Sequence, residues 1–266
     1  MKAIFLIVIY NKEIALSPLF EKIKRETDFI RIIFDNSTDE KLRNKNEQFC
    51  IKNNVNYYTL KKNVGLSKAY NYSFEQITKE KLDFNYLILC DDDTSFLNGY
   101  FKELENIDLS ENIGVYAPKV YGDKRNNLIF PKTSNKYKIF LNTRYDDKDI
   151  KHIYSINSGL CIHKNIVNKY RFDEKYFLYM IDWVFLEDMT KLNTKFKVMD
   201  SKVIQTFFEH EKNFNENSTL IQMKIRLLDT KEYTNFFNYT LFKNYYIIKN
   251  VIFRKNLKIF KLYKEC

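Results

Sequence analysis

Glycine and proline are scarce in this sequence of 266 residues, and closely spaced cysteines are absent. Each of these features excludes a class of protein. With five glycines, three prolines and 45% hydrophobic residues, the chain has the composition of a globular protein and not of a disordered one. The four cysteines form no C-x-x-C pair, so neither a disulfide framework nor a zinc site is expected, and a reducing cytoplasm fits best. No window of about 20 residues is free of charge, so no segment is expected to span a bilayer.

Apolar runs alternate with amphipathic segments along the first hundred residues. The strand-like runs cover residues 3–10, 29–34, 56–60 and 85–90. This rhythm predicts βαβ units, and therefore an α/β fold with a mixed, mainly parallel, Rossmann-like sheet flanked by helices. The first run resembles the apolar part of a signal peptide, but no small-residue cleavage site follows it, so we interpret it as a buried strand.

The second half of the chain is less regular. It predicts a helix opening near Leu97, strands near 114–120 and 154–163, and an amphipathic stretch over 175–191. The length allows one large domain, which we place at residues 1–212, followed by a basic helical extension over 213–266. The net charge of +10 favours anionic partners, whether nucleotide phosphates, lipid headgroups or nucleic acid.

Three consecutive carboxylates, Asp91, Asp92 and Asp93, follow the apolar run that ends at Cys90. Like charges at this density are costly unless a cation or solvent neutralises them. Mg²⁺ or Mn²⁺, held by carboxylate and diphosphate oxygens, is the natural counter-charge. The alternative is a solvated acidic turn that caps the next helix.

The segment NVGLSKAYN at residues 63–71 resembles the N-x-G-x-[AS]-x-[AG]-x-N motif of family 2 glycosyltransferases with the GT-A fold. Gly65 permits a close backbone approach, and the small Ser67 and Ala69 let the segment lie near a nucleotide. Further segments match this family in order, over about residues 3–210. They are VIYN at 8–11, DNSTD at 35–39, DDD at 91–93, NSG at 157–159, FDEKYFLYMID at 172–182 and FFEH at 207–210.

The resemblance implies an inverting, metal-dependent glycosyltransferase with Asp182 as the general base. The family often has acids where this chain has Ile181 and Val184, so Glu187, Asp188 and Asp173 are the alternatives. We expect Glu187 and Asp188 to lie on a solvated helix face. The nucleotide-binding half would cover residues 1–95 and the acceptor-binding half 96–212.

The same resemblance implies a set of binding residues. Those expected at the donor nucleotide are Tyr10, Asn11, Asp35, Asn63, Gly65, Lys68, Asn71, Asp91 and Asp92. Those expected at the donor sugar or acceptor are Asn157, Ser158, Gly159 and Trp183. Asp93 and His210 are expected to bind Mn²⁺ or Mg²⁺, although His210 is alternatively a packed histidine beside Phe207 and Phe208.

The substrates are expected to be a dTDP- or UDP-linked sugar and a glycan or polyprenyl-linked acceptor. Residues 172–182 resemble rhamnosyltransferases, so rhamnose is favoured over galactofuranose or another hexose. Enzymes of this kind commonly build capsule, lipopolysaccharide or other surface glycans. A location in the cytoplasm, at the inner face of the plasma membrane, is therefore expected.

The basic tail over 240–264 contains seven Lys and Arg residues and no acid. Leu241, Tyr245, Ile248 and Ile252 recur in it at helical spacing, which predicts an apolar stripe for an anionic membrane surface. The alternative is a closing helix that packs this stripe on the catalytic domain.

Two other classes of protein fit parts of the pattern. A sugar-phosphate nucleotidyltransferase would carry a glycine-rich loop after the first strand, but residues 10–14 contain no glycine. A nucleic-acid-binding protein would explain the positive charge, but it leaves the three aspartates unexplained because acids repel phosphates. No nucleic-acid partner is therefore expected.

Overall fold

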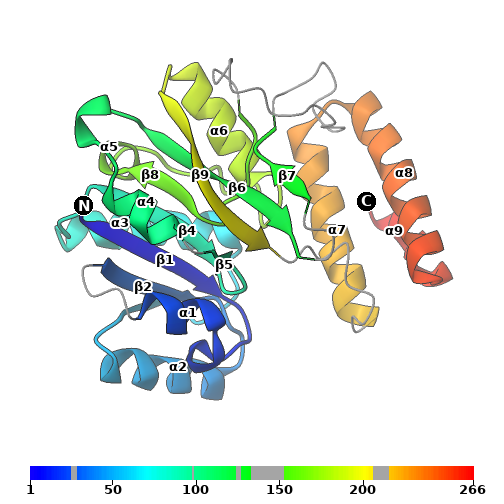
Figure 1. Ribbon diagram of the computed structural model, residues 1–266. Coiled ribbons are helices and arrows are strands. Elements are labelled where there is room, and N and C mark those ends of the chain that lie inside the picture. The colour runs from blue at the N-terminus through cyan, green and yellow to red at the C-terminus, as the bar shows by residue number, and fades with distance from the viewer. Residues whose placement is uncertain (25–28, 98, 124–126, 133–152, 206–215) are drawn as a thin grey trace.

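A mixed β-sheet with helices on both faces forms the body of the computed structural model (Figure 1). The structure describes residues 1–24, 29–97, 99–123, 127–132, 153–205 and 216–266. Within these residues the sheet has nine strands in the order β3-β2-β1-β4-β8-β6-β9-β5, with β7 paired to β6. The predicted α/β class with a mainly parallel sheet is confirmed.

The first four strands run parallel and match the apolar runs of the sequence. They are β1 (Ala3–Ile9), β2 (Phe29–Asp35), β3 (Asn56–Thr59) and β4 (Tyr86–Asp91). β1 lies between β2 and β4, with Ile9 opposite Asp35 and Val8 opposite Asp91. The polar residues that follow these strands therefore meet at one edge of the sheet.

The rest of the sheet is mixed. It contains β5 (Ser95–Phe96), β6 (Val115–Gly122), β7 (Leu128–Phe130), β8 (Leu160–His163) and β9 (Phe196–Gln205). β8 is antiparallel to both β4 and β6, whereas β9 runs parallel to β6. The strand expected over 154–163 is shorter than predicted, and β9 was not predicted.

Helices cover both faces of the sheet and form the C-terminal region. The α-helices are α1 (Pro18–Ile23), α2 (Glu40–Lys52), α3 (Leu66–Lys79), α4 (Tyr100–Glu105), α5 (Lys164–Val167), α6 (Ile181–Lys191), α7 (Glu216–Tyr233), α8 (Phe236–Arg254) and α9 (Leu262–Glu265). Short 3₁₀ helices are η1 (Ile14–Leu16), η2 (Leu109–Glu111) and η4 (Leu257–Lys261). The helix expected near Leu97 is α4. The amphipathic stretch over 175–191 is helical only from Ile181.

The strand periodicity separates two hydrophobic cores. In β1, Phe5 and Ile7 face a core that includes Phe20 of α1, whereas Ile4 and Leu6 face a core that includes Phe74 of α3. Because side chains alternate across a strand, one apolar run supplies both faces of the sheet. The apolar composition of β1 thus follows from its central position.

The C-terminal helices have a hydrophobic core of their own. Met223 and Leu227 of α7 pack there with Phe242, Tyr246 and Ile247 of α8. Figure 1 shows α7 and α8 side by side at one side of the sheet. In the described part of the chain, no helix has both the length and the apolar character to cross a membrane.

Candidate active site

Asp91 is the last residue of β4, and its carboxylate meets the 157–159 segment. Asn157 Nδ2 donates to Asp91 Oδ1 at 3.0 Å, and Ser158 Oγ donates to Asp91 Oδ2 at 3.1 Å. Burial, followed by the nearby Asp93, raises the pKa of Asp91 to about 7. Asp91 and Asn157 are 66 residues apart in sequence, and their two segments thus form one polar site.

The other two acids of the triplet have different partners. Lys12 Nζ lies 2.6 Å from Asp92 Oδ2, and Gln205 Nε2 donates to Asp93 Oδ1 at 2.6 Å. Burial raises the pKa of Asp93, although the hydrogen bond from Gln205 opposes that shift. Gln205 ends β9, and no motif in the sequence drew attention to it. The alternation of apolar and charged residues in β9 is the signal that predicts such a strand.

Among the described residues, Asp93 is the predicted ligand of a divalent cation, and its carboxylate suits that role. Among the residues that the structure describes, no group of three or more His, Cys, Asp or Glu side chains surrounds a common metal position. His210, the other predicted ligand, lies outside the described residues. Mg²⁺ is commonly bound by one or two carboxylates with substrate phosphates, which agrees with the carboxylate of Asp93 beside Asp91.

Asp182 lies in the first turn of α6, directly after Ile181 and the left-handed Met180 at φ +63°. Its carboxylate accepts the backbone N–H of Trp183 at 3.0 Å. Burial raises the pKa of Asp182 to about 7, and the backbone N–H groups of Trp183 and Asn157 oppose that shift. A carboxyl with this pKa is about half ionised near neutral pH.

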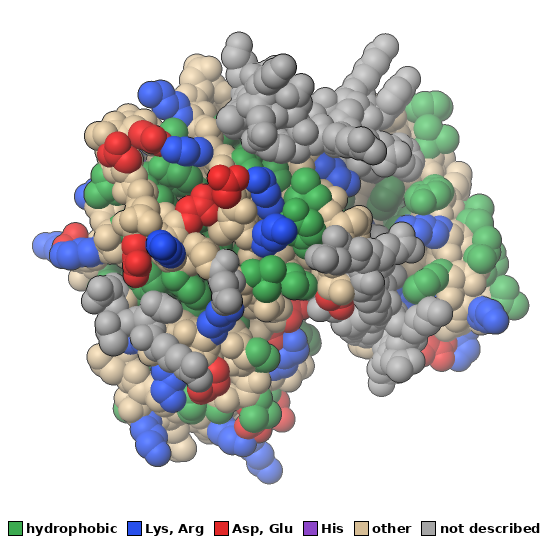
Figure 2. Space-filling model, viewed as in Figure 1, with side chains coloured by type: hydrophobic (Ala, Val, Ile, Leu, Met, Phe, Trp, Pro, Cys, Tyr) green, Lys and Arg blue, Asp and Glu red, His purple; other side chains and the backbone are tan. Residues whose placement is uncertain are grey.

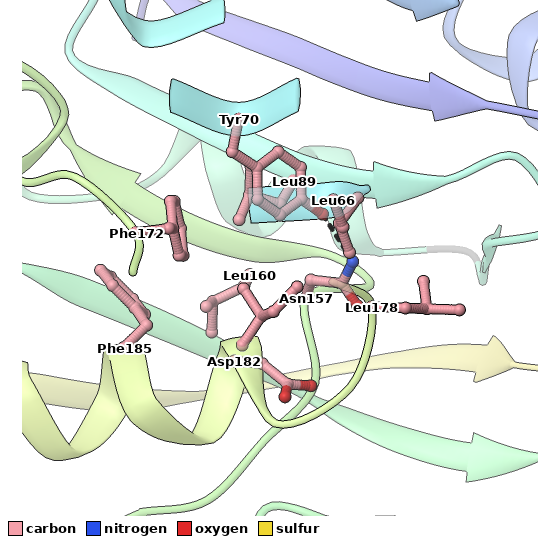
Figure 3. Close-up of a pocket in the computed structure, with 10 residues that line it drawn as sticks. Leu66, Tyr70, Leu89, Asn157, Leu160, Phe172, Leu178, Asp182 and Phe185 are labelled. Carbon is pink, nitrogen blue, oxygen red and sulfur yellow. Dashed lines mark hydrogen bonds between the residues drawn. The ribbon is translucent and has the colours of Figure 1, made fainter. Parts of the chain in front are cut away.

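Asn157 connects the acid of β4 with the acid of α6. Its side chain donates to Asp91 and to Tyr70 Oη, the latter at 2.6 Å, while its backbone N–H stabilises the Asp182 carboxylate. Figure 3 shows Asn157 and Asp182 beside one small cavity. Its largely apolar lining, which explains the raised pKa of Asp182, consists of Leu66, Tyr70, Leu89, Leu160, Phe172, Leu178, Ile181 and Phe185.

The NVGLSKAYN segment holds the loop that precedes Asp182, residues 172–180, here named the base loop. Ser67 Oγ donates to the carbonyl of Tyr176 at 2.7 Å, and Leu66 N donates to that of Phe177 at 2.6 Å. Asn71 accepts from the backbone N–H of Phe172 and donates to its carbonyl. Small residues in this motif therefore allow close contact between α3 and the base loop.

The close contact between this motif and the base loop is clearest at Gly65. It has φ +79°, and a Cβ atom there would lie 2.6 Å from the carbonyl oxygen of Phe177. Its neighbour Asn63 accepts the N–H of Gly65 at 3.1 Å, and Lys68 pairs with Glu174 of the base loop at 3.3 Å. The close backbone approach predicted for Gly65 is present, with the base loop as the described partner.

The remaining predicted nucleotide residues lie at the ends of β1 and β2. Asp35 is fully buried, and its carboxylate accepts from Asn46, Tyr57 and the backbone N–H of Ser37. Asn11, at φ +50°, accepts from the backbone N–H of Thr38 at 3.0 Å. Tyr10 is exposed beside it. Asn46 was not singled out from the sequence.

Glu187 and Asp188 do not form the solvated helix face that was expected. Tyr154 and Tyr233 both donate hydroxyl hydrogen bonds to Glu187 Oε1, at 2.7 and 2.6 Å. Tyr170 donates to Asp188 at 3.0 Å. The expectation was wrong because these partners come from segments distant in sequence.

Comparison with known proteins identifies the family. A model described as "Glycosyl transferase family 2" matches residues 4–177, which include the NVGLSKAYN segment and the acid triplet. The chain belongs to glycosyl transferase family 2. This family 2 glycosyltransferase gives no match among curated proteins.

Solved structures show the same fold at low sequence identity. S. aureus TarS matches with a TM-score of 0.54 and 16% identity, over 86% of this chain and 40% of that chain. A structure of TarS 1-349 in complex with UDP-GlcNAc gives 0.55 and 17%, over 86% and 66%. GalNAc-T7 with UDP, GalNAc and Mn²⁺ gives 0.56 and 12%, over 84% and 48%. The glycosyltransferase described here thus spans from about two fifths to two thirds of the length of these chains. Their fold agrees with the predicted GT-A fold.

Proposed function

We propose that the protein transfers a sugar from a nucleoside-diphosphate donor to a glycan or lipid-linked glycan, with inversion at the anomeric carbon. The observation that carries this proposal is that Asn157, whose side chain donates to Asp91, lines the same small cavity as Asp182. Asn157 therefore contacts a strand-end acid suited to the donor and shares a cavity with a carboxyl whose pKa is raised to about 7. Inversion itself rests on the family resemblance.

Asp182 acts as the general base in this proposal. Its ionised carboxylate takes the proton of the acceptor hydroxyl as that oxygen attacks the anomeric carbon, on the face opposite the nucleotide. The apolar cavity beside it keeps the carboxyl basic enough to do so near pH 7. General-base assistance of this kind contributes about two to four orders of magnitude in rate.

The donor lies at the carboxyl edge of β1, β2 and β4. UDP is favoured because S. aureus TarS and GalNAc-T7 have this fold and were solved with UDP-containing ligands, while dTDP remains the alternative. Tyr10 and Asn11, at the end of β1, would contact the nucleoside directly. Asp35 and Asn71, whose polar groups are engaged within the protein, would shape the pocket around it. The resemblance of the base loop favours a rhamnose-like sugar instead, which would be carried by dTDP.

Asp93 is the proposed protein ligand for Mn²⁺ or Mg²⁺, with His210 as a second. The cation would neutralise the charge that develops on the leaving diphosphate. Asp93 contributes an anionic oxygen whose partial burial disfavours its unpaired charge. Mn²⁺ in the GalNAc-T7 structure supports this choice of ion.

Trp183 is the proposed platform for the acceptor or the transferred sugar. It follows Asp182, and its ring meets those of Tyr154 and Tyr233 at centroid distances of 5.4 and 6.1 Å. Glu187 fixes both tyrosines through their hydroxyl groups. Such a rigid aromatic cluster suits the apolar face of a sugar ring. On this proposal residues 1–95 bind the nucleotide and residues 96–212 bind the acceptor.

Helix α8 is the proposed contact with an anionic membrane at the cytoplasmic face, where capsule or lipopolysaccharide precursors are assembled. Leu241, Tyr245, Ile248 and Ile252 are between 47% and 71% exposed, while the opposite face of α8 packs on α7. Hydrophobic side chains accordingly line the outer margin of the C-terminal region in Figure 2. The exposed Lys255, Lys261 and Lys264 complement anionic headgroups.

A thermal-shift panel of UDP, dTDP, GDP and ADP, each with and without Mn²⁺, tests the donor assignment. A ligand that binds only the folded state raises the unfolding temperature by mass action. We expect UDP or dTDP with Mn²⁺ to give the largest increase. No shift with any nucleoside diphosphate would contradict the proposal.

A further inference from the structure

Asp229 of α7 is a buried acid that binds the backbone of the base loop. Its carboxylate accepts three consecutive N–H groups, from Phe177 at 3.0 Å, Leu178 at 2.9 Å and Tyr179 at 2.7 Å. The side chain is only 3% exposed. An isolated buried carboxylate is costly, so its retention at this place depends on these three bonds.

The base loop is therefore held from two sides. On one side, α3 binds its carbonyl groups through Ser67 and Leu66. On the other side, Asp229 binds its N–H groups. Between these clamps the chain turns through the left-handed Met180 and enters α6, where Asp182 occupies the first turn.

Further contacts from α7 follow the same loop. Tyr179 Oη donates to Gln222 at 3.0 Å, and the guanidinium of Arg226 lies 5.1 Å from the ring centroid of Tyr179. The charge of Arg226 also acts on Asp182 and lowers its pKa, against the larger effect of burial. Helix α7 thus borders the active site, although it lies beyond the residues that the family model matches.

We infer that Asp229 is a positioning residue for catalysis, which fixes the base loop so that Asp182 reaches the acceptor hydroxyl. This inference rests on the proposed role of Asp182 as the base. It gives the C-terminal helices a part in the reaction that is separate from any membrane contact. A misplacement of about 1 Å in a reacting group can reduce the rate about a hundredfold.

Asp229→Asn is the decisive variant because it keeps the size of the side chain. The amide has only one acceptor oxygen and directs an N–H₂ donor toward backbone N–H groups, so at least one of the three bonds is lost. Thr230→Val is the matched control. Thr230 is buried at the next position, but its hydroxyl donates within α7, to the carbonyl of Arg226 at 2.7 Å.

Two measurements on the full-length protein test the inference. Hydrogen–deuterium exchange of peptides spanning residues 176–182 should accelerate about tenfold or more in Asp229→Asn and stay unchanged in Thr230→Val. Turnover, followed as nucleoside diphosphate release from the UDP- or dTDP-sugar that the wild type uses, should fall about ten- to a hundredfold in Asp229→Asn. The dissociation constant for UDP or dTDP with Mn²⁺ should change less than threefold.

The inference is overturned if exchange in residues 176–182 matches the wild type, or if turnover falls no further than in Thr230→Val. Equal losses of turnover and of nucleotide affinity would also overturn it, because they indicate general damage. If the wild type releases no nucleoside diphosphate from any sugar donor, the proposed reaction fails instead. The exchange measurement still reports on Asp229 in that case.

Discussion

At the scale of single residues, the most informative feature is the placement of acids in apolar surroundings. Burial raises the pKa of both Asp91 and Asp182 to about 7. Groups whose pKa is shifted by burial and by a neighbouring charge cluster at functional sites. The backbone N–H of Trp183 donates to Asp182 and favours its ionised form.

Asp182→Asn should reduce turnover by about two orders of magnitude or more, because the amide takes up no proton. Asp188→Asn, which removes an acid on the same helix that faces Tyr170, is the control and should keep turnover near that of the wild type. Steady-state release of nucleoside diphosphate checks both variants. Near-normal turnover in Asp182→Asn would exclude Asp182 as the base.

The raised pKa of Asp182 also predicts the pH dependence of stability. Between about pH 4 and pH 7 the folded protein retains a proton that the unfolded chain releases, so the free energy of unfolding falls as the pH rises through this window. In Asp182→Asn the free energy of unfolding does not fall in this way, because the amide does not ionise. It should be more stable than the wild type at pH 8, by roughly 1 to 4 kcal/mol, and should lose that advantage near pH 4.

Denaturant titrations of both proteins from pH 4 to pH 8 measure this difference. The sign is opposite to that of a salt-bridged aspartate, whose lowered pKa would make stability increase with pH. A difference between wild type and variant that is constant with pH would show that burial does not perturb Asp182.

Gly65→Ala should be damaging for two reasons that can be separated. Positive φ is strained for alanine, by about 1 to 3 kcal/mol, at both Gly65 and Gly99. Only at Gly65 does the added Cβ meet the Phe177 carbonyl, whereas no atom lies within 4 Å at Gly99. Gly65→Ala should therefore lower both stability and turnover well beyond Gly99→Ala, measured by thermal unfolding and nucleoside diphosphate release. Equal losses of stability and turnover in Gly65→Ala and Gly99→Ala would show that the base loop moves to accommodate the added Cβ atom.

At the scale of elements, local patterns predicted β1, β2, β3 and β4 because central parallel strands are apolar on both faces. β9 was missed because buried Phe196, Met199 and Val203 alternate there with exposed charges, and the pairing with β6 shifts register between Ala117 and Lys119. An interrupted alternation is a weaker signal than a continuous apolar run.

The base loop could not be predicted from local patterns. Its apolar residues suit a helix, but its backbone is held in an irregular form because it accepts a hydrogen bond from Ser67 and donates to the side-chain oxygens of Asn71 and Asp229. These partners are some 50 to 110 positions away in sequence, with separations of 51 for Leu178 and 109 for Tyr176. The motifs drew attention to both segments. Their mutual contact, and the role of α7, required the three-dimensional structure.

At the scale of the whole molecule, the C-terminal helices join the catalytic body through α7 and present α8 outward. The predicted stripe of Leu241, Tyr245, Ile248 and Ile252 is exposed, so the alternative in which it packs on the catalytic domain does not hold. Truncation after Tyr239 would remove Phe242 and other core residues that cover α7. Surface substitutions therefore test membrane binding more cleanly than truncation.

The double variant Leu241→Asn with Ile252→Asn should reduce sedimentation with anionic liposomes by about tenfold, because it removes apolar area from the proposed contact. Ile51→Asn is the control, since Ile51 of α2 is 73% exposed and Ile252 is 71% exposed. Thermal unfolding should be nearly unchanged in both proteins. Equal sedimentation of the two variants would contradict the membrane role of α8.

The most direct test of the proposed active site compares nucleotide affinity in three proteins: the wild type, Asp93→Asn and Asp182→Asn. The ligands are UDP and dTDP, each with and without Mn²⁺. Calorimetric titration measures it for each protein. We expect Mn²⁺ to strengthen binding of one of the two nucleotides to the wild type and to Asp182→Asn alike, and to have no effect on Asp93→Asn. If Asp93→Asn keeps the Mn²⁺-dependent affinity, or if Asp182→Asn loses it, the assignment of metal ligand and base is wrong.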